Sequence, residues 1–186
     1  MHYFKRSCLL DNISVTDSVM HVGKMFRLQD VPSYADFTNL FDQYKICGIK
    51  LRFVFNKNSS DAGVNAAPLN QFLPNIYTVI DYDDGTALSG GNANTYLEYS
   101  NCHVNRLDRP FKRYFRPHIA EGAYGGVAFT RYANKKSCWL DTDSTDVEHY
   151  GAKYFIDGGM MGGSGTVIIG KLQVFATFYI ACKNVR

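Results

Sequence analysis

The segment Tyr44–Phe55 alternates between apolar and polar side chains, and this pattern constrains the fold more than any other feature of the chain. The residues on its apolar side are Cys47, Ile49, Leu51, Phe53 and Phe55. Lys50 and Arg52 lie on the opposite side. A period of two is typical of a β-strand with one face in a core and the other in a polar environment.

Other segments also have the character of strands, because they are rich in aromatic and β-branched residues and are separated by turn-forming residues. They are Tyr3–Leu10, Val19–Leu28, Asn75–Tyr82, Cys102–Leu107, Phe111–Ile119, Gly125–Tyr132, Tyr150–Asp157 and Thr166–Lys183. In the last one, a single face is predicted to hold Ile168, Leu172, Val174, Phe178 and Ile180. Such regular spacing favours a sandwich or a barrel over βαβ units.

Helical signal is confined to two short segments, Ser33–Asp42 and Asn92–Tyr99. In the first, Ser33 is predicted to cap the helix and to be followed by an apolar side that includes Leu40. The 186 residues suit one domain with a core of ordinary size. We therefore predict an all-β domain over residues 1–186, with two antiparallel sheets face to face and one or two short helices in loops.

Composition excludes several classes of protein. No segment has the 18 to 20 consecutive apolar residues of a membrane-spanning helix, and the first residues lack the apolar centre of a signal peptide, so we expect neither membrane insertion nor export. The five cysteines are widely spaced, without a CxxC unit. We expect them to be reduced and structural.

Residue patterns of enzymes and metal sites are missing. The histidines, at positions 2, 21, 103, 118 and 149, are not followed two positions later by Asp or His, as a cupin-type metal site requires. The acidic segments 81–85 and 141–148 lack the Glu or the Gly of a calcium loop, and Gly158–Gly165 lacks the Lys of a P-loop. We therefore predict no enzyme activity, no metal and no cofactor, and interpret these segments as loops.

A net charge of +3 is too small to indicate nucleic-acid binding, so the distribution of charge must carry that argument. Residues 106–116 contain five Arg or Lys against Asp108 alone, interleaved with aromatic residues. Strand alternation places Lys112, Tyr114 and Arg116 on one face. There, cations can neutralise phosphate and the ring can stack on unpaired bases, which makes these three residues candidate nucleic-acid contacts. An exposed strand face or a contact between subunits is the alternative interpretation.

Four segments, in this order along the chain, resemble a known family. Residues 28–53 join the predicted helix to the alternating strand through Leu-Phe-Asp-Gln-Tyr-Lys-Ile, and residues 73–84, 109–117 and 170–180 follow. Together they resemble the capsid proteins of circovirus-like, Rep-encoding, single-stranded DNA viruses. The resemblance implies an eight-stranded viral jelly roll that assembles with identical copies into a small icosahedral shell of T=1 type, enclosing circular single-stranded DNA.

The resemblance also implies partners and locations. We expect a virion protein that passes through the host nucleus during assembly and meets a host receptor that the sequence does not identify. Members of the family usually carry an Arg-rich N-terminal arm that binds DNA and directs nuclear entry, whereas only Lys5 and Arg6 stand near the start of this sequence. Because the arm would run from this end towards the shell interior, Lys5 and Arg6 form a second candidate nucleic-acid contact.

A cellular carbohydrate-binding or adhesion sandwich is the alternative function. It predicts a monomer or small oligomer with a sugar platform of Trp or Tyr rings. The sole tryptophan, Trp139, follows Cys138 in a predicted loop, which gives this alternative little support.

Overall fold

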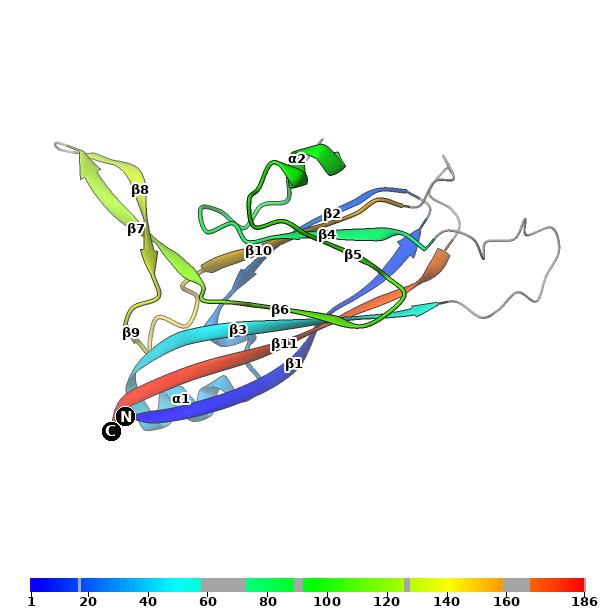
Figure 1. Cartoon of the computed structure of the whole chain (residues 1–186). Helices are drawn as coiled ribbons and strands as arrows, with labels where there is room; N and C mark the ends of the chain where they lie inside the picture. Colours follow the sequence, from blue (N-terminus) through cyan, green and yellow to red (C-terminus); the bar gives the residue numbers. More distant parts are fainter. Residues whose placement is uncertain (17, 58–72, 89–91, 126–127, 159–167, 186) are drawn as a thin grey trace.

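The computed structural model contains two antiparallel sheets packed face to face (Figure 1). It describes residues 1–16, 18–57, 73–88, 92–125, 128–158 and 168–185, with the backbone alone for 122–125 and 128–132. Most of the predicted loop 158–165 lies outside the described residues. No helix in these ranges is long and apolar enough to cross a membrane.

The first sheet has the spatial order β1-β11-β3-β6, with a short strand β9 pairing with β3. Its strands are β1 (His2–Thr16), β11 (Ile168–Val185), β3 (Phe41–Lys57), β6 (Phe111–Phe115) and β9 (Leu140–Asp141). The first and last strands of the chain are therefore neighbours, with His2 opposite Cys182.

The second sheet has the order β5-β4-β10-β7-β8, with β2 also paired with β10. Its strands are β2 (Met20–Phe26), β4 (Asn75–Val79), β5 (His103–Arg106), β7 (His118–Gly125), β8 (Ala128–Lys136) and β10 (His149–Ile156). Four strands of each sheet, β1-β11-β3-β6 and β2-β10-β4-β5, make an eight-stranded jelly roll, which confirms the predicted fold class. The hairpin β7–β8 projects away from this sandwich (Figure 1).

Large apolar side chains fill the space between the sheets. Phe26 of β2 packs against Phe115 and Phe178 of the first sheet, with ring centroids 5.6 and 6.1 Å apart. Asp11 of β1 joins the sheets through polar contacts, because it accepts hydrogen bonds from Tyr154 of β10 and Lys24 of β2, both at 2.6 Å. These contacts fix the face that each strand turns outward.

Cys47 is half-buried and does not face the core, so its predicted place on the apolar side was wrong. In the ladder with β11, Gly48 pairs with Tyr179 and Ile46 with Ile180, which leaves Cys47 as an extra residue. Such a β-bulge changes which side chains face inward beyond it. The core-facing residues of β3 are Tyr44 and Ile46 before the bulge, and Ile49, Leu51 and Phe53 after it.

A similar irregularity exposes Ile168, which was predicted to face the core. The ladder between β1 and β11 passes from Gly170, opposite Val15, to Ile168, opposite Thr16. Ile169 is buried in its place. The predicted strand Phe111–Ile119 is also divided, because Pro117 has no N–H to donate to a ladder and the chain passes there from the first sheet to the second.

Both predicted helices are present, α1 (Tyr34–Leu40) and α2 (Ala93–Leu97), together with a 3-10 turn at Leu28–Asp30. Ser33 stands at the cap position of α1, but its backbone is left-handed (φ 57°) and its side chain makes no capping bond, contrary to the prediction. Leu40 is exposed because α1 contacts the sandwich through Phe37. Asn92 caps α2, accepting hydrogen bonds from the next turn.

Residues 80–88 and 92–102, which include α2, cover the outer face of the second sheet (Figure 1). A second, smaller core forms there from Val79, Tyr96 and Phe155. The covering segment lies close to β2, because a Cβ on Gly23 of β2 would lie 2.2 Å from the carbonyl oxygen of Gly85. The central strands β4 and β10 are therefore mostly buried on both faces, whereas no described segment covers the outer face of β1, β11, β3 and β6.

Candidate nucleic-acid interface

The uncovered face of the first sheet gathers cations from four strands. In register across the sheet, Thr177 lies between Ser7 and Lys50, and Lys50 is opposite Tyr114. Two residues along β11 from Thr177, Phe175 is flanked by Leu9 and Arg52, and Arg52 is opposite Lys112. Residues opposite one another in an antiparallel pair point to the same side. We call this surface the basic face; its cations are Lys5, Lys45, Lys50, Arg52, Lys112 and Lys171.

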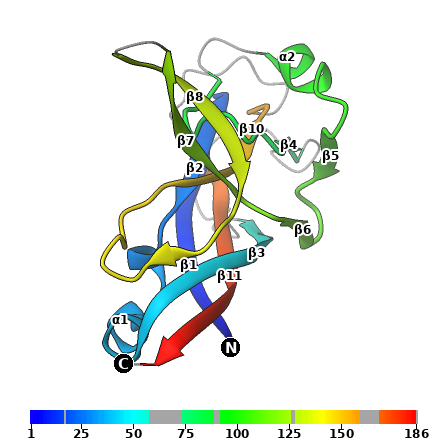
Figure 2. The same cartoon turned by 90° about the vertical axis from the view of Figure 1, so that its left-hand side faces the viewer.

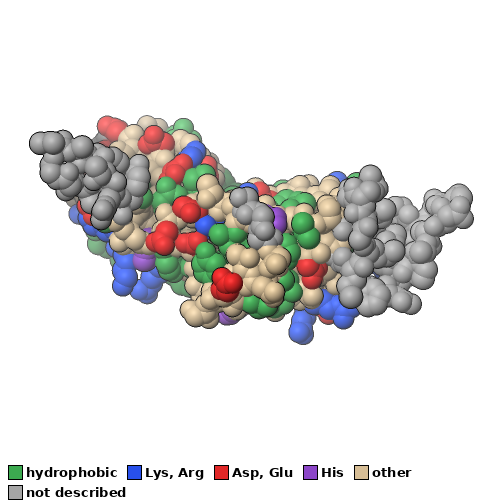
Figure 3. All heavy atoms as spheres, turned by 90° about the horizontal axis from the view of Figure 1, so that it is seen from above, with side chains coloured by type: hydrophobic (Ala, Val, Ile, Leu, Met, Phe, Trp, Pro, Cys, Tyr) green, Lys and Arg blue, Asp and Glu red, His purple; other side chains and the backbone are tan. Residues whose placement is uncertain are grey.

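Carboxylates do not neutralise the basic face within the described part of the chain. The ion pairs among the described residues all involve cations outside the basic face, namely Lys24, Arg27, Arg109, Lys135 and Lys153. By contrast, the side covered by α2 shows Asp and Glu side chains across it, and most visible Lys and Arg side chains project at its lower margin (Figure 3). The two sides of the sandwich therefore differ in charge.

Tyr114 forms an aromatic platform on the basic face. Its ring lies over Gly48, where a Cβ would be 2.4 Å from the phenolic oxygen, and it meets Tyr179 edge-on with centroids 6.1 Å apart. The side chain is 57% exposed, so one ring face is free for a ligand. A flat ring surrounded by cations suits an unpaired base on a phosphate backbone.

The alternation predicted for residues 111–116 agrees with the structure. Lys112, Tyr114 and Arg116 are exposed, whereas Arg113 and Phe115 are buried. Burial lowers the pKa of the Arg113 guanidinium, which donates a hydrogen bond to the carbonyl of Asn101 at 3.0 Å. Arg113 therefore binds the chain internally instead of joining the basic face.

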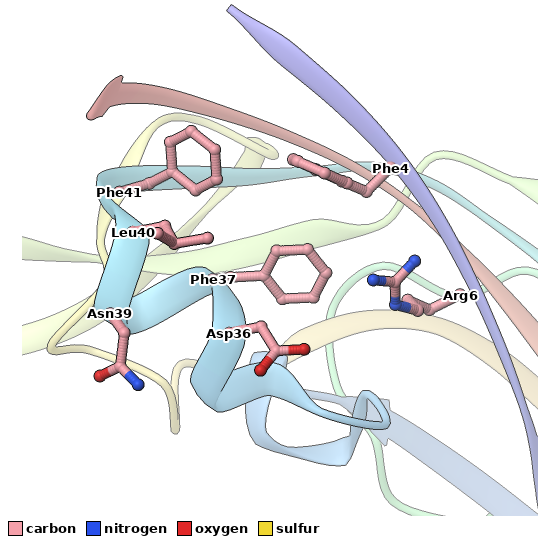
Figure 4. A pocket seen from close by; sticks show the side chains of 7 residues that line it. All are labelled: Phe4, Arg6, Asp36, Phe37, Asn39, Leu40 and Phe41. Atoms are coloured by element: carbon pink, nitrogen blue, oxygen red, sulfur yellow. The ribbon is translucent and has the colours of Figure 1, made fainter. Parts of the chain in front are cut away.

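Lys5 and Arg6 lie on opposite sides of β1, so they do not form one contact. Lys5 is exposed beside Tyr179 on the basic face. Arg6 points towards α1, with its guanidinium 5.4 Å from the centroid of Phe37 (Figure 4). It lines a groove of about 340 Å³ between β1 and α1 (Figure 4).

Four cations of the basic face were not among the predicted contacts: Lys45, Lys50, Arg52 and Lys171. The alternation of Tyr44–Phe55 already placed Lys50 and Arg52 on a polar side, but the sequence does not say that this strand lies next to residues 111–115. Lys45 and Lys171 have no sequence signal of their own, since each is an isolated lysine on a strand.

The described residues provide little evidence for a metal site or a sugar-binding site. Within the described residues, no cluster of three or more His, Cys, Asp or Glu side chains could hold a metal ion. All five cysteines are free thiols. Trp139 carries the ammonium of Lys183 over its ring at 4.6 Å, so one of its faces is occupied.

Comparison with known proteins identifies the family. The family model described as circovirus capsid protein matches residues 10–186. The chain belongs to this family. It is therefore a capsid protein, a structural component of a virion. No curated protein sequence matches this capsid protein.

Solved structures share the fold of the capsid protein. The BFDV capsid protein in a 60-mer has a TM-score of 0.71 at 14% identity, covering 98% of this chain and 93% of that one. The same BFDV protein in a decamer gives 0.58 at 14% identity, covering 98% and 99%. The Melon necrotic spot virus structure gives 0.60 at 8% identity, covering all of this chain and 56% of that one. At such identities the similarity concerns the fold alone.

Proposed function

We propose that residues 1–186 act as one capsid domain that closes with identical copies into a T=1 icosahedral shell around circular single-stranded DNA. The protein has a structural role without catalysis, and assembly takes place in the host nucleus. The BFDV 60-mer has the number of subunits of such a shell, and its chain has the same fold. The size of the particle is tested by electron microscopy of the purified protein, and a monodisperse monomer would contradict the proposal.

The basic face is the surface we assign to the packaged DNA, and it is the observation that carries this proposal. It is uncovered, its described cations have no carboxylate partners, and Tyr114 offers a ring for stacking. Cations without partners bind phosphate chiefly through release of condensed counterions, without reading sequence. Packaging of any genome sequence requires such a mode of binding.

Replacing Lys50 and Arg52 together by Gln is expected to make single-stranded DNA binding less dependent on salt. Removing one cation that neutralises a phosphate reduces the slope of log K against log salt concentration by about 0.7, so the double variant should have a slope smaller by about 1.4. Fluorescence anisotropy with a labelled oligonucleotide at several salt concentrations measures this slope.

Adjacent residues on β1 provide the matched control. Lys5→Gln should lower the same slope by about 0.7, whereas Arg6→Gln should leave it unchanged, because Arg6 points towards α1. Equal effects of the two substitutions would contradict the assignment of the basic face.

Gly48→Ala is expected to weaken single-stranded DNA binding about tenfold by displacing the Tyr114 ring, since stacking of one base on an aromatic side chain contributes about 1–3 kcal/mol. Stability should change by less than about 0.5 kcal/mol, because the atoms displaced are the exposed end of a side chain. Anisotropy and urea unfolding measure the two quantities. Ser14→Ala, on the outward side of β1, is the control; a similar loss of binding there would refute the role of the ring.

A further inference from the structure

A cleft of about 750 Å³ opens where β3, the corner between β6 and β7, and the end of β8 meet. Figure 2 faces the side of the molecule on which β3, β7 and β8 come together. Lys45, Arg116 and Lys136 line the cleft, and none of its described lining residues is Asp or Glu. The walls therefore favour an anionic ligand.

Aromatic rings form further walls of this cleft. Tyr114 lines it from β6, and Tyr82 stacks on His118 with ring centroids 3.9 Å apart and planes 15° apart. The His118 ring donates a hydrogen bond from Nδ1 to Asn134 Oδ1, and Asn134 in turn donates to Asp83 at 3.0 Å. This chain of contacts holds the ring pair in place, so the cleft offers flat surfaces to a planar group.

Ser137 supplies an unused hydroxyl group in the lining. The residue is only 9% exposed, and its Oγ is buried without a hydrogen-bond partner among the described residues. Its backbone N–H donates to the carbonyl of Pro117 at 3.3 Å, which fixes its position at the cleft. Buried hydroxyl groups are normally hydrogen-bonded, so rotation of this side chain towards the cleft would let the hydroxyl bind an oxygen of a ligand.

We propose that the cleft holds one unpaired nucleotide, with its phosphate at Arg116, Lys136 and Ser137 and its base against the ring of Tyr114. The cations and the hydroxyl match a phosphate group, and the rings match a base. The inference rests on the proposed binding of the genome by the basic face, and adds a defined site at the edge of that face. Bases of a duplex are stacked on one another, so only a single strand can place a base face against Tyr114.

Two neighbouring lysines of β8 provide a matched test. Lys136 lines the cleft, whereas Lys135 pairs with Glu121 at 2.8 Å and is not among the lining residues. The probes for the purified full chain are a fluorescein-labelled oligothymidylate, the same strand with abasic sites, and the matching duplex. Lys136→Gln should weaken oligothymidylate binding about threefold, and Lys135→Gln should leave it unchanged. Tyr114→Leu should weaken it about tenfold, to the level of the abasic strand.

Photocrosslinking with a 5-iodouracil strand locates the base. Adducts mapped by mass spectrometry to Tyr82, Tyr114 or His118 support the site. Equal binding by the Lys136 and Lys135 variants, with adducts elsewhere on the basic face, would overturn the cleft while leaving the proposed function intact. Absence of DNA binding by any variant, including the wild-type chain, would overturn both. Equal affinity for normal and abasic strands, together with displacement by heparin, would identify a site for polyanions and reject the nucleotide site.

Discussion

Acidification from pH 6.5 to about 4 is expected to lower the free energy of unfolding of this capsid protein by about 3 kcal/mol through His149 alone. His149 begins β10 and is fully buried. Its Nδ1–H donates to the carbonyl of Val147 at 3.0 Å, and its Nε2 is buried without a hydrogen bond to any described residue. The neutral ring makes one hydrogen bond and carries no charge, whereas a second proton would place a charge in a buried site.

Burial lowers the pKa of His149 to about 4, and the backbone carbonyls of Val147 and Phe26 counteract this lowering only in part. The unfolded chain therefore binds the proton between pH 6.5 and 4 while the folded chain does not. Stability is fully present above pH 6.5, and it is lost as the pH falls towards 4, at about 1.4 kcal/mol per pH unit. The change falls at the junction of three strands, because His149 is opposite both Phe26 of β2 and Ile119 of β7.

Urea unfolding at a series of pH values tests this expectation. His149→Gln keeps a hydrogen-bond donor but cannot titrate, so its stability should depend less on pH between 6.5 and 4 than that of the wild type. The quantity to compare is the slope of the unfolding free energy against pH, because the substitution also changes the absolute stability. His2→Gln is the control, because that histidine is exposed on β1. An unchanged slope in the His149 variant would falsify the prediction.

Lys153→Met is expected to destabilise the fold by about 3–5 kcal/mol at pH 7, because it leaves carboxylates without their cation. Lys153 is 1% exposed on β10, and its ammonium lies 2.9 Å from Asp81 and 2.6 Å from Asp84. Burial alone would lower the pKa of Lys153, but hydrogen bonds to Asp84 and Asp81 raise it. Most of the destabilisation comes from the unpaired charge of Asp81, whose side chain is 10% exposed. The side chain of Asp84 is 56% exposed, so solvent screens its charge.

A mutant cycle separates loss of charge pairing from loss of packing. The triple variant Lys153→Met, Asp81→Asn, Asp84→Asn should recover most of the stability lost in the single variant, because the uncompensated charges are gone. Urea midpoints at pH 7 provide the comparison. If the triple variant is less stable than Lys153→Met alone, the three residues do not act as a charge cluster.

The sequence by itself determined the fold class and most of the elements. Apolar side chains that alternate with period two, as in Ile49 to Phe53 and again in Phe111 to Phe115, specify half-buried strands wherever those strands pair. Local patterns likewise predicted both helices, although the capping bonds are made by Asn92 of α2 and not by Ser33 of α1. The outward direction of Lys112, Tyr114 and Arg116 follows from alternation alone.

Tertiary structure decided which residues meet. The sequence does not reveal that Lys50 lies opposite Tyr114, that Lys5 and Arg6 point to different sides of the sandwich, or that a bulge turns Cys47 away from the core. His149 and Lys153 have no signal of burial in the sequence, because their burial depends on segments that are distant in the chain. Alternation is a property of one strand, whereas register, bulges and cover arise from pairing between strands, and the free energy that fixes them is gained only when the sheets pack.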